Sequence, residues 1–481
     1  MVATSATSLQ PNGNGNSVGF AGLSWEHNSG IMKVKPNTPA ETKRQKTHDR
    51  KETSIDLPED LVINITARLP LKSVVRFKLV CREWKLLTES AFFRGLYSSN
   101  LSSTSSSYWS IFHGDHKSRH SSLEELKVLD EPSWHGDSSF ASFVTRNIKN
   151  KIKEIRVVAC TDGLVLLRLE DEEDMKIRYY IGNPVLPQWI QLPPPTPDVP
   201  HPYKYGFSDT GLVTRMHNGA LLDYKVVRLY SEAVKFCFFS PTWSFDIFSS
   251  TTGEWSVKKV SCPGKGVSMR SISNPISLDG KLHWPDQSRR IIVYDFFSHD
   301  DHVRALCLPA RMQGTQWDPF ETTCYKVFCP SPCGKLICTT SQGYFVLVDV
   351  GLIEEEVKSY NVRVWRLKCD SWSWEKVWEI NMACVGLAPN CVPMAVNYFD
   401  IDIIYLWDLD RKCFLGYNLR ENTISYKARR DGVYKVFTSI FRMKEDGVYY
   451  DEDTICFEGY PCLMQYIPSL QVVPTYKGSR K

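Results

Sequence analysis

The stretch LPEDLVINITARLPLKSVVRFKLVCREW, residues 57–84, decides the N-terminal fold. Within it Leu61, Ile65 and Leu69 recur every four residues, which places them along one face of a helix. Pro70 interrupts that helix, because a proline inside a helix removes a hydrogen bond and clashes with the preceding turn. The pattern therefore predicts a first short helix that ends near Pro70.

Two further short helices are predicted after Pro70. A second apolar stripe is formed by Leu71, Val74, Val75 and Leu79, and a third helix is marked by Trp84 and Leu87. Three short helices make a small core, and a core of this size usually needs a partner to complete it. The simplest alternative is a free helical hairpin whose leucines and Trp84 serve only their own core.

Three elements of this stretch carry a family resemblance. The Leu57-Pro58 opening, the central Arg68-Leu69-Pro70 and the closing Val80-Cys81-Arg82-x-Trp84 resemble the F-box motif in order and spacing. The resemblance implies that the segment binds a Skp-type adaptor and, through it, a cullin scaffold. We expect the adaptor-binding surface to include Leu57, Pro58, Leu61, Ile65, Leu69, Pro70, Leu71, Val75, Leu79, Val80, Cys81 and Trp84.

The C-terminal two thirds of the chain have a β pattern. Short apolar runs, such as 164–167, 344–348 and 403–406, are separated by Gly, Pro, Asn, Asp and Ser. No helical pattern alternates with them, which argues against a parallel α/β sheet. The 14 Trp, 22 Tyr and 23 Phe also favour strands.

A loose repeat runs through this β region, in which a polar residue is followed by an aromatic on the return strand. Examples are Asn183…Trp189, Asp246…Trp255 and Lys368…Trp374. Repeats on this scale indicate a propeller of about six to eight blades. Radial closure would also protect the many strand edges.

Several pieces of the β region resemble the F-box-associated domain of plant F-box proteins. In chain order they are 160–167, Gly182-Asn183-Pro184, 223–228, 248–255 and 278–284. The resemblance implies a kelch-like, propeller-like domain that binds a target protein, and it does not name the target.

The fold class expected is therefore a multidomain α+β chain, with a small three-helix F-box followed by a mainly antiparallel β-propeller-like domain. We expect a disordered tail over residues 1–52, the F-box over 53–97, a linker and irregular region over 98–150, and the β-domain over 151–475.

Composition narrows the function classes. The net charge of +4 is close to balanced and gives no general case for nucleic-acid or membrane binding. No apolar run approaches the length of a membrane span, and no secretory signal precedes the 15 cysteines. We therefore expect a protein of the nucleus, the cytoplasm or both. The basic cluster between Lys33 and Lys51 is either a nuclear import signal or a solvated flexible tail.

No motif predicts catalysis, a cofactor or a metal. Cys324, Cys329, Cys333 and Cys338 crowd together, but their gaps do not match the Cys-x-x-Cys knuckles of zinc sites. The chain has no P-loop, no G-x-S-x-G elbow and no G-x-G-x-x-G. We expect a non-enzymatic adaptor without cofactor or metal.

The function expected is that of the substrate-recognition subunit of a Skp-cullin-F-box ubiquitin ligase, which brings a target protein close to a conjugating enzyme. Three alternatives stay open: a propeller enzyme of the kelch or oxidase type with a metal in its channel, an F-box protein with a non-degradative scaffold role, and a basic-tailed nuclear binder of nucleic acid.

Overall fold

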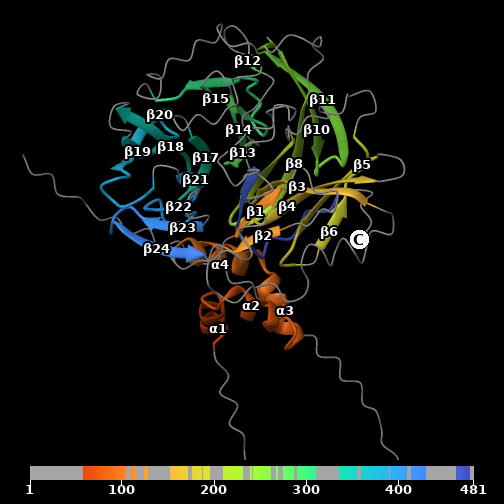
Figure 1. Cartoon of the computed structure of the whole chain (residues 1–481). Coiled ribbons are helices and arrows are strands. Elements are labelled where there is room, and N and C mark those ends of the chain that lie inside the picture. Colours follow the sequence, from red (N-terminus) through yellow and green to blue (C-terminus); the bar gives the residue numbers. More distant parts are fainter. Residues whose placement is uncertain are drawn as a thin grey trace, which may run out of the picture. The chain divides into compact units, whose positions relative to one another are not determined.

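The structure is a computed structural model of the whole chain (Figure 1). It describes residues 58–103, 110–114, 124–127, 152–171, 176–186, 188–195, 210–230, 239–240, 242–261, 267–268, 275–286, 290–309, 335–354, 359–388, 391–408, 413–428 and 462–476. All of these belong to one unit of contacts, Leu57–Lys481. The tail 1–52, Leu57, Cys324, Cys329 and Cys333 lie outside the described residues. Nothing in the described part is a helix with the length and apolar character needed to cross a bilayer.

Four helices open the described chain. They are α1 (Glu59–Thr66), α2 (Leu71–Phe77), α3 (Arg82–Glu89) and α4 (Ala91–Ser103). The first three confirm the predicted helices. The fourth takes up residues 98–103, which were predicted as part of a linker. Phe93 and Tyr97 are both buried in the core below this helix, and they anchor it well before its last turn.

Six of the seven sheets in the described chain lie around a common centre (Figure 1). Five sheets are four-stranded and antiparallel, and the sixth is three-stranded, among the described residues. The first two hold β3 (Ile152–Thr161), β4 (Leu164–Asp171), β5 (Ile177–Asn183) and β6 (Gln188–Gln191), then β7 (Thr210–His217), β8 (Ala220–Tyr230), β10 (Thr242–Ser249) and β11 (Glu254–Ser261). A small ladder pairs β9 (Phe239–Ser240) with β12 (Val267–Ser268).

The next three sheets follow in chain order. The third is β13 (Ile276–Leu278), β14 (Lys281–Asp286), β15 (Arg290–Asp295) and β16 (Arg304–Cys307). The fourth is β17 (Lys335–Ser341), β18 (Tyr344–Glu354), β19 (Ser359–Lys368) and β20 (Ser373–Asn381). The fifth is β21 (Cys391–Val396), β22 (Ile403–Asp408), β23 (Cys413–Asn418) and β24 (Thr423–Ala428).

The sixth sheet closes the ring from both ends of the chain. It joins β2 (Glu124–Lys127), β1 (Ser110–Gly114) and β25 (Cys462–Tyr466), with Ser110 opposite Tyr466. The innermost strands β3, β7, β13, β17, β21 and β25 contact one another in that order, and β25 returns to β3. In the described part of the chain the fold is therefore a propeller of six blades, within the predicted range of about six to eight, and its first and last sheets contact each other. β1 and β2 lie inside the region predicted as irregular, because closure requires strands from the N-terminal side.

The core lies between successive blades. Apolar clusters join the first sheet to the second, the second to the third, the third to the fourth and the fourth to the fifth. In β18 the whole run from Phe345 to Val350 is buried, because a middle strand has a neighbouring blade on each face. The outer strand β20 has no such cover, and none of its residues is fully buried.

The predicted aromatic repeat has a physical role at two positions. The Trp255 indole in β11 donates to the Pro193 carbonyl at the end of the preceding blade, at 2.9 Å. The Trp374 indole in β20 does the same to the Cys307 carbonyl, at 2.8 Å. Each tryptophan on an outer strand thus links its blade to the one before it.

Candidate functional site

Two prolines fix where the first helices begin. The Pro58 carbonyl accepts the Leu61 amide at 3.0 Å, and the Pro70 carbonyl accepts the Ser73 amide at 2.8 Å. Each proline stands at the N-cap of its helix, where its missing N–H is not required. Both prolines were predicted as adaptor-binding residues, and both are exposed.

One side of these helices packs on the propeller. Ile63, Ala67 and Val74 are buried there against Val185 and Leu186 of the first blade. The C-terminal segment after β25 joins this cluster through Leu470.

Three predicted adaptor-binding residues take part in this cluster. Leu71 is 3% exposed within it, so its side chain supports the helices and does not reach their surface. Leu69 and Val75 are half-buried against the same cluster.

The other side of the helices exposes apolar side chains. Leu61 is 50% exposed and Ile65 is 54% exposed, so the stripe predicted from the four-residue spacing faces outward on α1. Leu79 and Val80, in the turn between α2 and α3, are 85% and 65% exposed. Exposed aliphatic residues gathered on a small helical unit are typical of an interaction site.

Two further exposed residues were missed by the sequence reasoning. Leu86 on α3 is 60% exposed, and Phe92 on α4 is 69% exposed. The exposure of Phe92 could have been predicted from the sequence, because consecutive residues of a helix point in different directions. Phe93 is fully buried, so its neighbour Phe92 has to face elsewhere.

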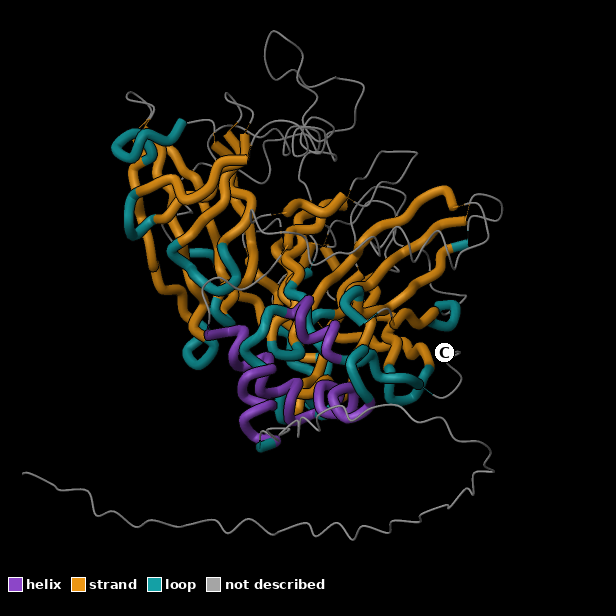
Figure 2. Tube along the Cα trace, turned by 90° about the horizontal axis from the view of Figure 1, so that it is seen from below, coloured by secondary structure: helices purple, strands orange, loops and turns teal. Residues whose placement is uncertain are grey.

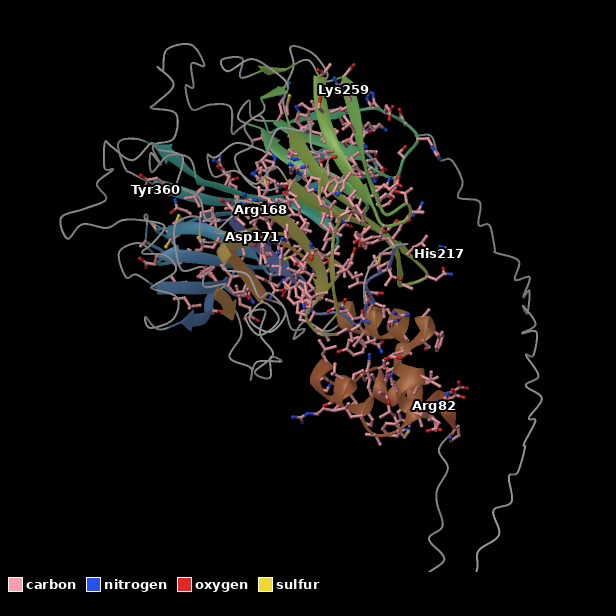
Figure 3. The ribbon with its side chains drawn as sticks, turned by 90° about the vertical axis from the view of Figure 1, so that its right-hand side faces the viewer. Arg82, Arg168, Asp171, His217, Lys259 and Tyr360 are labelled. Carbon is pink, nitrogen blue, oxygen red and sulfur yellow. The ribbon has the colours of Figure 1, made fainter. Side chains whose placement is uncertain are left out.

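The turn that carries Leu79 and Val80 is held from behind. The Trp84 ring lies 4.4 Å from the Phe77 ring, which joins α3 to α2. Lys78 and Glu89 form an ion pair at 3.8 Å. Burial lowers the pKa of Lys78, partly offset by the charge of Glu89. The half-buried Trp84 is therefore part of the frame that holds the exposed pair, and Cys81 is half-buried as well. Figure 3 shows Arg82, at the start of α3, on the side of the helices away from the sheets.

The described contacts of the helices with Gly219, Val185 and Leu186 lie at one end of the blades. A Cβ on Gly219, in the turn between β7 and β8, would come within 2.5 Å of the Gly95 Cα in α4. Val185 and Leu186, which also meet the helices, lie in the turn between β5 and β6. Figure 2 shows the helices together on one side, with the strands spreading away from them.

The connections between successive blades are longer than the turns within a blade at the helix end, which include two-residue turns and the longer connections 296–303 and 397–402. The inner strand turns into the second strand through two residues at 162–163, 218–219, 279–280 and 342–343. Since strands alternate in direction, the strand ends that 192–209, 262–275, 308–334, 382–390 and 429–461 join lie at the opposite end of the blades. Loops on a rigid scaffold are where binding residues gather.

The family comparisons agree with this architecture. The F-box domain family matches residues 55–94, and the family described as "F-box protein At3g26010-like, beta-propeller" matches residues 106–470. This chain belongs to that family of F-box proteins. Both predicted resemblances are thereby confirmed, as is the mainly antiparallel fold class.

Curated relatives of this F-box protein come from Arabidopsis thaliana. The putative F-box protein At3g23950 is 33% identical, over 77% of this chain and 84% of its own length. The putative F-box/kelch-repeat protein At1g15680 is 30% identical, over 88% of this chain and 94% of its own. Among solved structures, a hypothetical selenium-binding protein from Sulfolobus tokodaii overlaps 69% of this chain and 77% of its own, with 10% identity and a TM-score of 0.28, which is too distant to inform function.

Proposed function

We propose that this F-box protein is the substrate-recognition subunit of a Skp-cullin-F-box ubiquitin ligase. The observation that carries the proposal is that the helices have one buried side and one exposed apolar side. One side is buried on the propeller, while the other exposes Leu61, Ile65, Leu79 and Val80. Surface of this kind is stabilised when a partner covers it.

The adaptor would bind the exposed side of the helices. Leu79 and Val80 stand out most from the surface, and the frame behind them is ordered by the contact of Trp84 with Phe77. We add Leu86 and Phe92 to the predicted surface and assign Leu71 a supporting role. Leu57 keeps its predicted place in the surface.

The target would bind at the opposite end of the propeller. The helices lie at the end with the two-residue turns, so an adaptor bound there would leave the opposite end of the propeller for a target. In this arrangement the protein performs no chemistry of its own and raises the local concentration of its target near the conjugating enzyme. Such a protein would act in the nucleus, the cytoplasm or both.

The adaptor contact can be tested by replacing an exposed leucine of the helices and, as a control, an exposed leucine of the propeller. Leu79→Asp should weaken binding to a purified Skp-type adaptor by about 30-fold or more, since an interface anchor is often worth about 2 kcal/mol or more. Leu222 is 53% exposed on β8 of the propeller, so Leu222→Asp is the matched control and should bind normally. Titration calorimetry measures both. Equal affinity of the Leu79→Asp variant and the unchanged chain would refute the assignment.

Partners of the propeller are best found with the same variant. Deleting residues 53–97 would expose Val185, Leu186 and Leu470, which pack with the helices. The exposed apolar surface would bind other proteins non-specifically. Proximity labelling should therefore compare the unchanged chain with full-length Leu79→Asp. Proteins labelled by both belong to the propeller, and loss of every partner in the variant would argue against a separate target-binding end.

A further inference from the structure

A cavity of about 670 Å³ opens at the end of the propeller where the inner strands turn. Each of the six inner strands, or the turn that follows it, supplies at least one wall residue. Examples are Thr161, Thr214, Leu278, Thr340, Tyr398 and Gln465. Its volume is within the range of small-molecule sites, which is about 300–1,000 Å³.

The polar walls of this cavity are held in place. The Gln465 side chain donates to the Val396 carbonyl at 2.7 Å and accepts the Thr340 hydroxyl at 3.0 Å. The Thr214 hydroxyl donates to the Asp162 carboxylate. The cavity is therefore a preformed polar site, which lowers the entropic cost of binding a ligand.

Two carboxylates give the cavity an excess of negative charge. Asp162 and Asp279 stand at the same position of their two-residue turns, with φ of 46° and 49°. Among the described residues no ion pair includes Asp162 or Asp279, and the Lys281 ammonium donates to the Asp279 main-chain carbonyl at 3.4 Å. Asp162 is an exposed residue that lines the cavity. Desolvation raises the pKa of Asp162, and the charge of Asp279 raises it further.

The remaining charged wall residues are already neutralised. Asp295 faces Lys281 at 3.7 Å and also accepts the Phe297 amide at 2.9 Å. Arg215 forms an ion pair with Asp223, and its guanidinium lies 5.2 Å from the Phe297 ring. The charge of the two turn aspartates is therefore left for a ligand to balance.

Tyr398 is a further polar residue of the cavity wall. Its side chain is partly buried and lines the cavity. Burial raises its pKa to about 12, with a contribution from the charges of Asp162 and Asp279. It is therefore a neutral phenol, which can donate or accept a hydrogen bond and offers its ring face to a cation.

The chemistry of the walls selects the ligand. The two carboxylates repel an anion. A lone metal ion would leave most of the volume empty, and no group of three His, Cys, Asp or Glu is close enough to hold one, as far as the structure describes the chain. We propose that this cavity binds a small organic cation, an ammonium or guanidinium on a short chain, with Asp162 and Asp279 as counter-ions and the Tyr398 hydroxyl as its hydrogen-bond partner.

The site is next to the F-box helices. A second cavity of about 470 Å³ shares Asp162, Met216 and Tyr398 with the first, and Arg94 and Tyr97 of α4 line its other side. A bound cation would therefore lie where the helices meet the propeller. Ligand binding should raise the thermal unfolding temperature of the full chain, because it stabilises only the folded state.

Titration calorimetry on the full chain tests the site, with agmatine as the probe because it carries both a guanidinium and an ammonium. Butane-1,4-diol and succinate are the neutral and anionic comparisons. We expect one agmatine per chain, with an affinity that falls as salt is added, and no heat from the other two compounds. Calcium chloride is titrated as well, and saturable Ca²⁺ binding in place of agmatine would overturn the proposal.

Variants then show where agmatine sits. Asp279→Asn should weaken agmatine at least tenfold and keep the fold, since Asn tolerates a positive φ as Asp does. Asp300→Asn, at an exposed carboxylate outside the cavity, is the matched control and should bind normally. Tyr398→Phe keeps the ring and should weaken binding by a smaller factor. Unchanged affinity in both cavity variants would mean adventitious binding only and would overturn the proposal.

The proposal stands apart from the adaptor role. Neither Asp279 nor Tyr398 belongs to the exposed surface of the helices, so adaptor affinity in their variants should stay unchanged. A chain that binds agmatine but no adaptor, or the reverse, separates the two proposals.

Discussion

The contact between α4 and the propeller rests on two glycines, and replacing one of them gives a sharp test. Gly219 has a φ of +74°, and its carbonyl accepts the Gln471 side chain at 2.7 Å. In Gly219→Ala the new Cβ would lie 2.5 Å from the Gly95 Cα, which is backbone and cannot swing aside. The helix and the hairpin would have to separate.

The cost has two parts. An alanine at positive φ is strained by about 1–2 kcal/mol, and overpacking against backbone adds about 1–3 kcal/mol. Gly343 separates these parts. It occupies the corresponding turn between β17 and β18 with a φ of +76°, but a Cβ there meets nothing within 4 Å. Gly343→Ala should therefore lose only the conformational part.

Urea unfolding of the two full-length variants measures the difference. We expect Gly219→Ala to lose about 1–3 kcal/mol more in free energy of unfolding than Gly343→Ala. Limited proteolysis should also cleave the Gly219→Ala chain faster near α4. Equal losses in the two variants would show that the helix does not lie against this hairpin, and the docking described above would be wrong.

Three further outcomes are expected. His283 is buried and its pKa is lowered to about 4, so between pH 6.5 and 4 only the unfolded state takes up a proton at this residue. As the pH falls through that window, the folded chain should lose about 3 kcal/mol of stability through His283. The His283→Gln variant should lose less stability over the same window, and unfolding measured as a function of pH would show the difference. Leu71→Ala should cost about 2–5 kcal/mol of stability, whereas Leu61→Ala should cost under about 0.5 kcal/mol and reduce adaptor affinity. Calorimetry of unfolding and of adaptor binding measures both effects, and equal losses of stability in the two variants would contradict this expectation. Asp246→Ala removes the carboxylate 2.7 Å from the buried Arg228 and should destabilise the chain by about 3–5 kcal/mol in denaturant titrations; a loss under 1 kcal/mol would go against it.

The helices and strands could largely be predicted because their signals are local. The four-residue spacing of Leu61 and Ile65 describes α1 correctly, and the turn pairs Asp162-Gly163 and Asp279-Gly280 mark hairpins whose residues adopt positive φ. These features depend only on neighbours a few residues away. The prediction failed for residues 98–103, because a serine-rich segment is compatible with both a linker and the end of a helix. These residues were predicted as a linker and they continue α4.

The candidate surfaces were predictable only in part. Leu71 and Leu79 have the same side chain and lie in the same short stretch, yet one is 3% and the other 85% exposed. No spacing rule separates them, because the difference arises from what packs against the helices. Leu71 is buried in a cluster that includes Val185 and Leu470, which are remote in sequence.

By itself the sequence determined that a short helical motif precedes a long series of antiparallel strands, because periodicity and turn chemistry act over a few residues. Only the tertiary structure decided that six blades close through the pairing of β1 with β25, and that the inner turns enclose a cavity with Asp162 and Asp279 in its wall. Those properties depend on residues hundreds of positions apart, whose proximity follows from packing all the blades at once and not from any local pattern.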